Sequence, residues 1–191
     1  MRRTALATTI TVASTALACS PVPAPLIIWN ATPSVPVGLY RVTARPLSIG
    51  ALAVVSLPSH IRRLAAERGY LPASALLIKP IVGLPGDTVC RYGRLVTVNG
   101  RFAALAYDTD ANQRQLPKWT GCHRLDDAQV VVISKRPDSF DSRYFGPLSR
   151  ADIAGLAISL WVPTPAVTAY VDRQHAPGGR RSADNDLPTA L

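Results

Sequence analysis

The sequence predicts a mainly β domain with small helical insertions, preceded by one N-terminal hydrophobic helix. Short runs of β-branched and apolar residues recur along the chain between turn signals. Aromatic residues make up 6% of the 191 residues while prolines number 17, and this composition favours strands and loops over a helical bundle. The third observation is a long uncharged segment directly behind Met1-Arg2-Arg3. A chain of this length can bury a sizeable core as a single domain.

The N-terminal segment predicts export of the rest of the chain. No charged residue occurs between Thr4 and Tyr40, and Pro21 ends any helix that begins at Thr4. Residues 4–20 would form about 25 Å of helix, which is the minimum for crossing a bilayer and long for the core of a signal peptide. We therefore expect residues 1–28 to be a signal peptide or a membrane anchor, with the arginines on the cytoplasmic side. The arginine pair and the terminal position disfavour a buried core helix.

Strand-like runs rich in β-branched and apolar residues fill most of the exported part. Turn signals at Tyr92-Gly-Arg94 and at Asn99-Gly100 separate three of these runs. The runs cover residues 37–42, 51–57, 76–82, 87–92, 95–99, 130–133 and 153–162.

One surface helix is predicted over residues 59–69. Ser59 is the expected N-cap, Gly69 stands just past the expected end, and the apolar residues between them share one face. From residue 172 the chain is polar and rich in proline and glycine, which predicts a disordered basic tail over residues 172–191. The folded domain is therefore expected over residues 29–171.

The formal net charge of +9 limits the classes of partner. It fits either a solvated basic surface or contact with anionic lipid headgroups. Nucleic acid is a weaker interpretation, because the basic residues are spread out and no run of five or six occurs. We expect a membrane surface as a partner and no nucleic acid.

Two cysteines lie in the exported part. Cys90 and Cys122 are more simply explained as a disulfide than as free thiols, because disulfides persist in oxidising compartments. The chain-entropy model assigns roughly 3–4 kcal/mol to a loop of this length. His123 adjoins Cys122, but no spacing resembles a four-ligand zinc site, so we expect no metal and no cofactor.

Ser34 is the candidate nucleophile. It stands in the stretch NATPSVPVGLY, between Pro33 and Pro36, where the prolines fix the backbone. A serine nucleophile needs a base that takes its proton. The histidines are poor candidates for that role: His60 is in the predicted surface helix, His123 follows a predicted disulfide cysteine, and His175 is in the predicted tail.

Lys79 is the candidate base. Lys118 and Lys135 lie in polar surroundings, whereas Lys79 interrupts an otherwise apolar run over residues 75–83. Burial disfavours the ammonium form and can leave a neutral amine that accepts a proton. The alternative is a solvated lysine that blocks pairing at the edge of a sheet.

Three sequence boxes resemble those of a known family. Residues 79–89, KPIVGLPGDTV, resemble the lysine box of the signal peptidase I family of serine–lysine proteases, and residues 139–146, SFDSRYFG, resemble its downstream Ser-x-Asp-Ser-Arg box. Around Ser34 the pattern Ser-x-Pro-x-Gly-x-Tyr is most similar to the TraF-type proteases of conjugative plasmid transfer. Val35 replaces the methionine of general signal peptidases, and residues 134–138, SKRPD, replace their Gly-Asp-Asn. These departures favour a dedicated processing enzyme.

The resemblance implies roles for the nucleophile box and the lysine box. Ser34 would attack the scissile carbonyl, and neutral Lys79 would take its proton and pass it to the leaving amine. The backbone N–H of Ser34 and the hydroxyl of Thr32 would form the oxyanion hole, in which one donor contributes roughly 3–4 kcal/mol.

The downstream box supplies supporting residues in the same comparison. Ser139 would hydrogen-bond the lysine amine and orient it. Asp141 and Arg143 would brace the site from behind as an ion pair. For this pair a purely structural bridge and a direct contribution of Asp141 to catalysis both stay open.

The resemblance also implies a fold, a substrate and a place. The fold would be a signal-peptidase-like β-sheet catalytic domain. The substrate would be the pilin precursor of a type IV secretion and mating-pair apparatus, or another exported protein, processed in the periplasm at the inner membrane. Cleavage could be accompanied by joining of the new carboxyl end to the pilin's own N-terminus. The apolar residues up to Trp29 would enter the lipid interface. The alternatives are a general signal peptidase and a non-catalytic periplasmic component of the mating apparatus.

Overall fold

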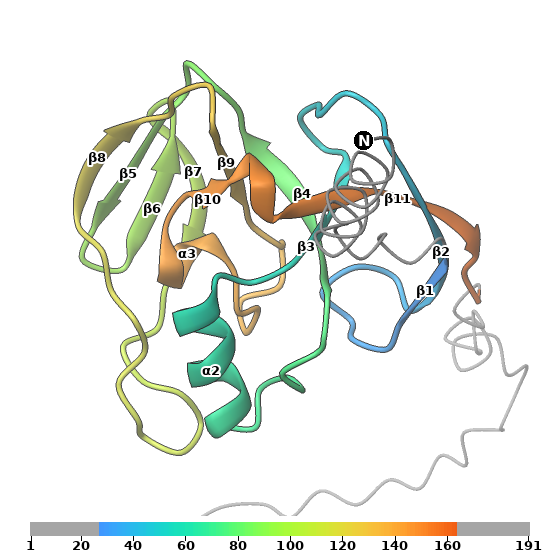
Figure 1. Cartoon of the computed structure of the whole chain (residues 1–191). Coiled ribbons are helices and arrows are strands. Elements are labelled where there is room, and N and C mark those ends of the chain that lie inside the picture. The colour runs from blue at the N-terminus through green and yellow to red at the C-terminus, as the bar shows by residue number, and fades with distance from the viewer. Residues whose placement is uncertain (1–26, 164–191) are drawn as a thin grey trace, which may run out of the picture.

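Two antiparallel sheets make up most of the domain (Figure 1). The computed structural model describes residues 27–163. The larger sheet has the strand order β1-β2-β11-β3-β4-β9-β10, and the smaller sheet has the order β7-β6-β5-β8. The predicted mainly β class is confirmed. Residues 1–26 of the predicted export segment and the predicted tail over residues 172–191 lie outside the described residues.

The elements have the following bounds. The larger sheet consists of β1 (Ile27–Asn30), β2 (Gly38–Thr43), β3 (Leu52–Val55), β4 (Leu77–Gly83), β9 (Gln129–Val132), β10 (Leu148–Ser149) and β11 (Ile153–Trp161). The smaller sheet consists of β5 (Thr88–Tyr92), β6 (Leu95–Val98), β7 (Arg101–Leu105) and β8 (Gly121–Arg124). The helices are α2 (Ser59–Glu67), α3 (Ser142–Phe145) and the 3-10 helix η2 (Arg150–Asp152).

The predicted strand runs all form strands, but four further strands were not predicted. The first two residues of β1 were assigned to the export segment, yet Ile28 pairs with Tyr40 of β2. β8 has the sequence GCHR and is mostly exposed, so it lacks the apolar alternation by which a strand is recognised. β7 begins with two exposed residues, and β10 is only two residues long. Pairing with a neighbouring strand, and not local pattern, makes these segments strands.

Helix α2 packs on the larger sheet as the sequence predicts. Ile61 and Ala65 are buried against apolar residues of β3, β4 and β9. The predicted N-cap is wrong: Pro58 occupies that position, Ser59 is already helical, and no side chain caps the helix. The end is as expected, because Gly69 has a φ of +71° just beyond Arg68.

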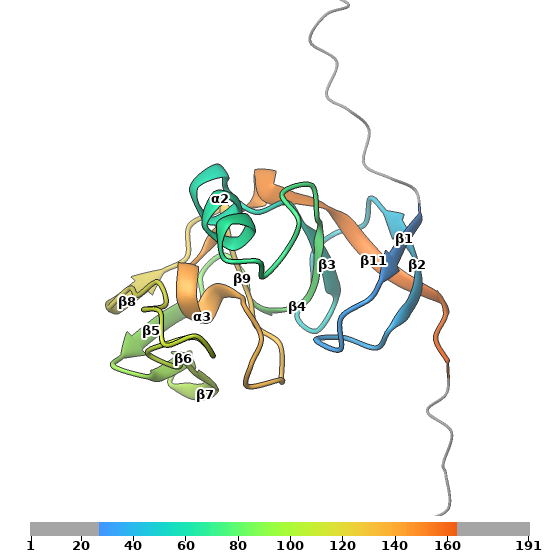
Figure 2. The same cartoon turned by 90° about the horizontal axis from the view of Figure 1, so that it is seen from below.

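Strand β4 runs through the middle of the molecule. It pairs with β3 on one side and with β9 on the other. In Figures 1 and 2 it lies between the smaller sheet at one end and β1, β2 and β11 at the other. Side chains on β4 therefore meet residues from both parts of the domain.

The predicted disulfide is present. Cys90 of β5 lies directly opposite Cys122 of β8, with the two Cα atoms 4.0 Å apart. This bond fastens β8 and the loop before it, which contains Trp119, to the smaller sheet.

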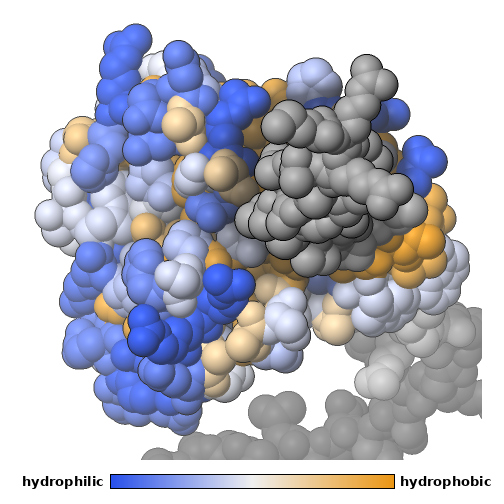
Figure 3. Space-filling model, viewed as in Figure 1, coloured by the Kyte–Doolittle hydropathy of each residue, from blue (hydrophilic) through white to orange (hydrophobic). Residues whose placement is uncertain are grey.

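Exposed apolar side chains gather at the end of the molecule formed by β1 and β11. Four side chains there are at least half exposed: Ile27, Trp29, Leu160 and Trp161. The rings of Trp29 and Trp161 stack, with their centroids 6.0 Å apart. Figure 3 shows apolar surface on this side of the molecule. Among the described residues no helix has the length and hydropathy needed to cross a membrane.

Candidate active site

The loop that carries Ser34 is held by one buried amide. It connects β1 to β2, and Asn30 is the last residue of β1. The Nδ2 atom of Asn30 donates to the carbonyl oxygens of Thr32 (2.7 Å), Val35 (3.1 Å) and Pro36 (3.0 Å). Its Oδ1 atom accepts from the backbone N–H of Thr32 at 3.3 Å and from the Thr32 hydroxyl at 3.2 Å. Asn30 and the prolines together fix the backbone around Ser34.

A second tether reaches Ser34 from the other side of the domain. The buried Ser134 hydroxyl donates to the main-chain carbonyl of Ser34 at 2.6 Å. The Ser34 hydroxyl itself lies 3.2 Å from the Thr32 hydroxyl. Neither Asn30 nor Ser134 was predicted, although Ser134 opens the segment that departs from the Gly-Asp-Asn of general signal peptidases.

Lys79 is buried on the central strand β4. It is 4% exposed, and its Nζ atom donates to Ser139 Oγ at 2.6 Å. The alternative of a solvated edge-strand lysine is wrong, because β4 has a neighbour on each side. Burial lowers the pKa of Lys79 to about 8, while the Asp141 carboxylate raises it and the Arg143 guanidinium lowers it.

Asp141 and Arg143 form a buried ion pair behind Lys79. Their side chains are 0% and 1% exposed, and Arg143 Nε lies 2.8 Å from Asp141 Oδ1. Asp141 Oδ2 also accepts from the backbone N–H of Ser134 at 2.9 Å. Arg143 donates to the carbonyl oxygens of Ser134 (2.6 Å) and Pro137 (3.0 Å). The pair therefore holds the segment that carries both Ser134 and Ser139.

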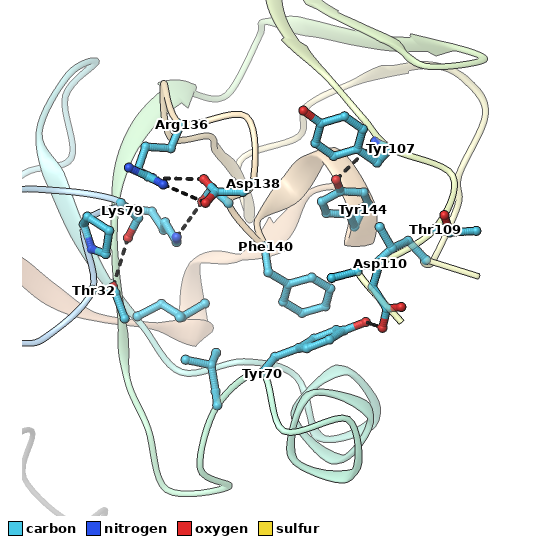
Figure 4. Close-up of a pocket in the computed structure, with 17 residues that line it drawn as sticks. Thr32, Tyr70, Lys79, Tyr107, Thr109, Asp110, Arg136, Asp138, Phe140 and Tyr144 are labelled. Atoms are coloured by element: carbon cyan, nitrogen blue, oxygen red, sulfur yellow. Dashed lines mark hydrogen bonds and ion pairs between the residues drawn. The ribbon is translucent and has the colours of Figure 1, made fainter. Parts of the chain in front are cut away.

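One cavity brings the candidate residues together (Figure 4). Its volume is about 500 Å³, and Thr32, Ser34, Lys79 and Ser139 all line it. Asp141 and Arg143 do not line it and lie buried behind it. A hydroxyl and an amine of lowered pKa in one cavity are the components of nucleophilic catalysis with a lysine base. Among the described residues no cluster of histidine, cysteine or acidic side chains could hold a metal ion.

The family follows from a sequence comparison. Residues 1–162 match the family described as "Signal peptidase, peptidase S26". The chain belongs to this family. By that description the members of the family are peptidases. The fold and the cavity described above are those of one member of this family.

Several relatives of this S26 chain are named as conjugal or plasmid transfer proteins. It is 37% identical over 140 residues to "Probable conjugal transfer protein TraF" of Sinorhizobium fredii, covering 67% of this chain and 73% of that protein. It is 34% identical over 139 residues to "Conjugal transfer protein TraF" of Agrobacterium fabrum (67% and 78%). It is 32% identical over 135 residues to "Plasmid transfer protein TraF" of Escherichia coli (65% and 76%). A signal peptidase I of Enterococcus faecalis of known crystal structure is 20% identical, with a TM-score of 0.35, covering 60% of this chain and 98% of that one.

The smaller sheet of this S26 domain supports helix α3 from outside the cavity. Arg91 of β5 is 1% exposed and donates through Nη1 to the carbonyl of Arg143 at 2.7 Å. Trp119 donates through Nε1 to the carbonyl of Ser142 at 3.0 Å. Strand β5 and the loop before β8 therefore both contact the main chain of α3, the helix that carries Arg143. Neither contact could be recognised in the sequence.

Proposed function

We propose that this chain is a serine endopeptidase with a Ser34–Lys79 dyad. The observation that carries the proposal is the buried Lys79 amine, with a pKa of about 8, in the same cavity as the Ser34 hydroxyl. At that pKa about a tenth of Lys79 is neutral at pH 7 and able to act as a base, far more than for a lysine with the usual pKa of about 10.4. Membership of the S26 family supports the same chemistry.

The proposed reaction proceeds through an ester. Lys79 takes the proton of the Ser34 hydroxyl as its oxygen attacks the scissile carbonyl. The Ser34 backbone N–H and the Thr32 hydroxyl donate to the oxygen that becomes negative. The peptide C–N bond then breaks, Lys79 returns the proton to the leaving amine, and the acyl group stays on Ser34 as an ester. A second nucleophile, water or an amine, then attacks this ester; Lys79 takes its proton and passes it to the Ser34 oxygen as the ester C–O bond breaks, which restores the Ser34 hydroxyl.

Ser139 and the buried pair have supporting roles in this proposal. Ser139 orients the amine through the hydrogen bond of 2.6 Å to Lys79. Asp141 and Arg143 fix the segment of Ser139 and adjust the pKa of Lys79 in opposite directions. Ser139 acts through its contact with the Lys79 amine, and Asp141 and Arg143 lie buried behind the cavity, so we regard all three as positioning residues.

The substrate that we propose is the precursor of a conjugative pilin. The names of the TraF relatives support a role in plasmid transfer. The exposed Trp29 and Trp161 support docking at a lipid interface, where tryptophan is favoured. Because Trp29 precedes Ser34 by one loop, a membrane-bound precursor would reach the nucleophile from the periplasmic face of the inner membrane.

The same site could join two ends of the pilin. Either an amine or water can attack the ester on Ser34. The nucleophile that is held closer to the ester carbonyl reacts first. An amine held beside the ester has an effective molarity of about 10⁵ M or more, which exceeds that of bulk water. We therefore propose that the new carboxyl end of the pilin is joined to the pilin's own N-terminus.

The intact mass of the pilin tests this proposal. The pilin should be isolated from conjugating cells that carry the wild-type chain, the Ser34→Ala variant or no copy. We expect a cyclic product from wild-type cells, lighter by one water than the linear product of the same residues and resistant to N-terminal sequencing. The full-length precursor should accumulate with Ser34→Ala.

Three other outcomes would each change the proposal. A linear mature pilin would contradict the proposed ligation but would still agree with the proposed protease activity. Mature pilin in Ser34→Ala cells would mean a non-catalytic component of the mating apparatus. Uncleaved leaders on unrelated exported proteins would favour a general signal peptidase, for which a 30% identical stretch of 96 residues in "Signal peptidase I V" of Bacillus subtilis is the supporting observation.

The rate of cleavage should rise with pH. Because the base is the neutral amine and burial lowers its pKa, the rate should increase through about pH 8 and level off above it. Single-turnover rates on an internally quenched peptide, measured from about pH 6 to pH 10, check this and keep product release out of the profile. A flat profile, or a rate that falls over this range, would contradict a lysine base.

A further inference from the structure

We propose that the half of the cavity around Phe140 is a subsite for one bulky apolar side chain of the substrate, within about three residues of the cleaved bond. The proposal rests on the proposed peptidase function and adds a determinant of specificity to it. It concerns the end of the cavity that lies away from Ser34.

The cavity has two chemically different ends. In Figure 4 Thr32, Lys79, Arg136 and Asp138 lie at one end, Tyr70 and Asp110 lie at the other, and Phe140 lies between them. The second end is lined mainly by apolar and aromatic side chains: Tyr70, Leu71, Leu77, Leu116, Phe140 and Tyr144.

The aromatic rings of the second end form a continuous wall. The Phe140 ring lies 5.3 Å from that of Tyr70 and 5.8 Å from that of Tyr144, measured between centroids. Leu116 packs in the same cluster and is 8% exposed. We call this end the Phe140 chamber. Apolar and aromatic walls of this kind favour an apolar ligand group.

The Phe140 chamber is closed by contacts between two loops. The Tyr70 hydroxyl donates to Asp110 Oδ2 at 2.5 Å, and Arg68 Nη1 donates to the carbonyl of Gln115 at 2.7 Å. Arg114, from the same loop as Asp110, donates through Nη2 to the carbonyl of Arg68 at 3.2 Å. The segment after α2 and the loop between β7 and β8 are thereby held together across the end of the cavity.

Asp110 forms part of this wall and has no acceptor site left for a cationic group of the substrate. Its Oδ1 atom accepts from the backbone N–H groups of Asn112 and Arg114, each at 2.9 Å, and its Oδ2 atom accepts from Tyr70 and Arg114. A carboxylate offers about four acceptor sites, so these contacts use all of them. Burial alone would raise the pKa of Asp110, but the hydrogen bonds hold it below its usual range. The chamber therefore selects apolar groups.

The position of the chamber limits which substrate residue can enter it. Leu77 lies two residues before Lys79 on the same face of β4, a separation of about 7 Å. Phe140 directly follows Ser139, the partner of Lys79. An extended substrate advances at most about 3.6 Å per residue. A side chain in the chamber thus belongs to a residue within about three positions of the bond held at Ser34.

The occupant is the polypeptide that is being cleaved, because the chamber is continuous with the cavity that contains Ser34. Phe140 and Tyr70 are only partly buried, so a substrate side chain would cover ring surface that the domain itself leaves open. No separate entrance or second ligand is needed for this arrangement.

A peptide library read by mass spectrometry tests the subsite. The full chain is incubated with peptides derived from a bacterial proteome, and the residues around every cleaved bond are counted. We expect one fixed position to be enriched at least about tenfold in Leu, Met or Phe over small and charged residues. Leu116→Phe, which fills the chamber, should reduce that enrichment roughly tenfold and shift it toward smaller residues.

Further variants keep the test decisive if Leu116→Phe does not fold. Leu71→Ala enlarges the chamber and should shift the preference toward larger side chains. Tyr70→Phe removes only the hydroxyl that bonds Asp110 and should broaden the preference. Leu95→Phe, on β6 and 39% exposed outside the cavity, is the matched control and should leave the preference unchanged. Thermal unfolding identifies the variants that are folded.

The outcomes separate this inference from the proposed function. Cleavage by the Ser34→Ala variant, or no cleavage by the wild type, would overturn the peptidase proposal. Cleavage that depends on Ser34 but shows no bulky apolar preference at any position would overturn the subsite alone. A preference that persists unchanged in the folded chamber variants would overturn it as well.

Discussion

Replacing Ser34 or Lys79 should abolish processing while the domain stays folded. Removal of one member of a nucleophile–base pair lowers kcat by about 10⁴–10⁶ in serine proteases. We expect losses of that order for Ser34→Ala and for Lys79→Met. Methionine replaces the ammonium by an apolar group of similar length on the buried strand β4, so the fold should be retained. Single-turnover cleavage of a quenched peptide and thermal unfolding measure the two properties separately.

Matched substitutions exclude a general effect of losing a serine or a lysine. Lys118→Met removes a lysine that is 47% exposed and paired with Asp108, and Ser59→Ala removes an exposed serine of α2. Both controls should cleave at the wild-type rate. In the double variant, Ser34→Ala with Lys79→Met, the cleavage rate should fall by about as much as in one single variant, because the two residues act in one step. A single variant that retains a tenth of the wild-type rate would contradict the dyad.

The catalytic candidates could be predicted because each one conflicts with its local sequence. A lysine in an apolar run and a serine fixed between prolines are conspicuous without any knowledge of the fold. The apolar run over residues 75–83 left both a buried lysine and a solvated edge-strand lysine open, and the structure places Lys79 on a strand between β3 and β9. The Cys90–Cys122 pairing followed in the same way from the count of cysteines in the part of the chain that is predicted to be exported.

The supporting residues could not be predicted, because their meaning depends on distant partners. Ser134 is an ordinary polar residue until the fold brings it to the carbonyl of Ser34, 100 positions away. Arg91 is likewise one of many arginines, and its contact with the carbonyl of Arg143 spans 52 positions. The same reason applies to β8, whose polar residues form a strand through pairing with β5. Local patterns report the chemistry of a segment but not the register that joins two segments.

Breaking the buried pair of Asp141 and Arg143 should destabilise the domain strongly. Removing one partner leaves an uncompensated buried charge, which costs about 3–5 kcal/mol of unfolding free energy. We expect that loss for Asp141→Ala and for Arg143→Met, measured by urea unfolding. Asp108→Asn, which breaks the exposed pair of Asp108 and Lys118, should change stability little. A stability loss equal to that of Asp108→Asn would mean that the Asp141–Arg143 pair is not buried as described.

The pH dependence of these variants distinguishes a structural bridge from a direct influence on the base. The Asp141 carboxylate raises the pKa of Lys79 and the Arg143 guanidinium lowers it. Asp141→Asn should therefore move the midpoint of the pH–rate profile below about 8, whereas Arg143→Gln should move it above that value. The two variants should be compared at a temperature where both are folded. A purely structural bridge would lower the rate of both variants and leave the midpoint in place, because only a charge close to Lys79 can shift the equilibrium between its ammonium and amine forms.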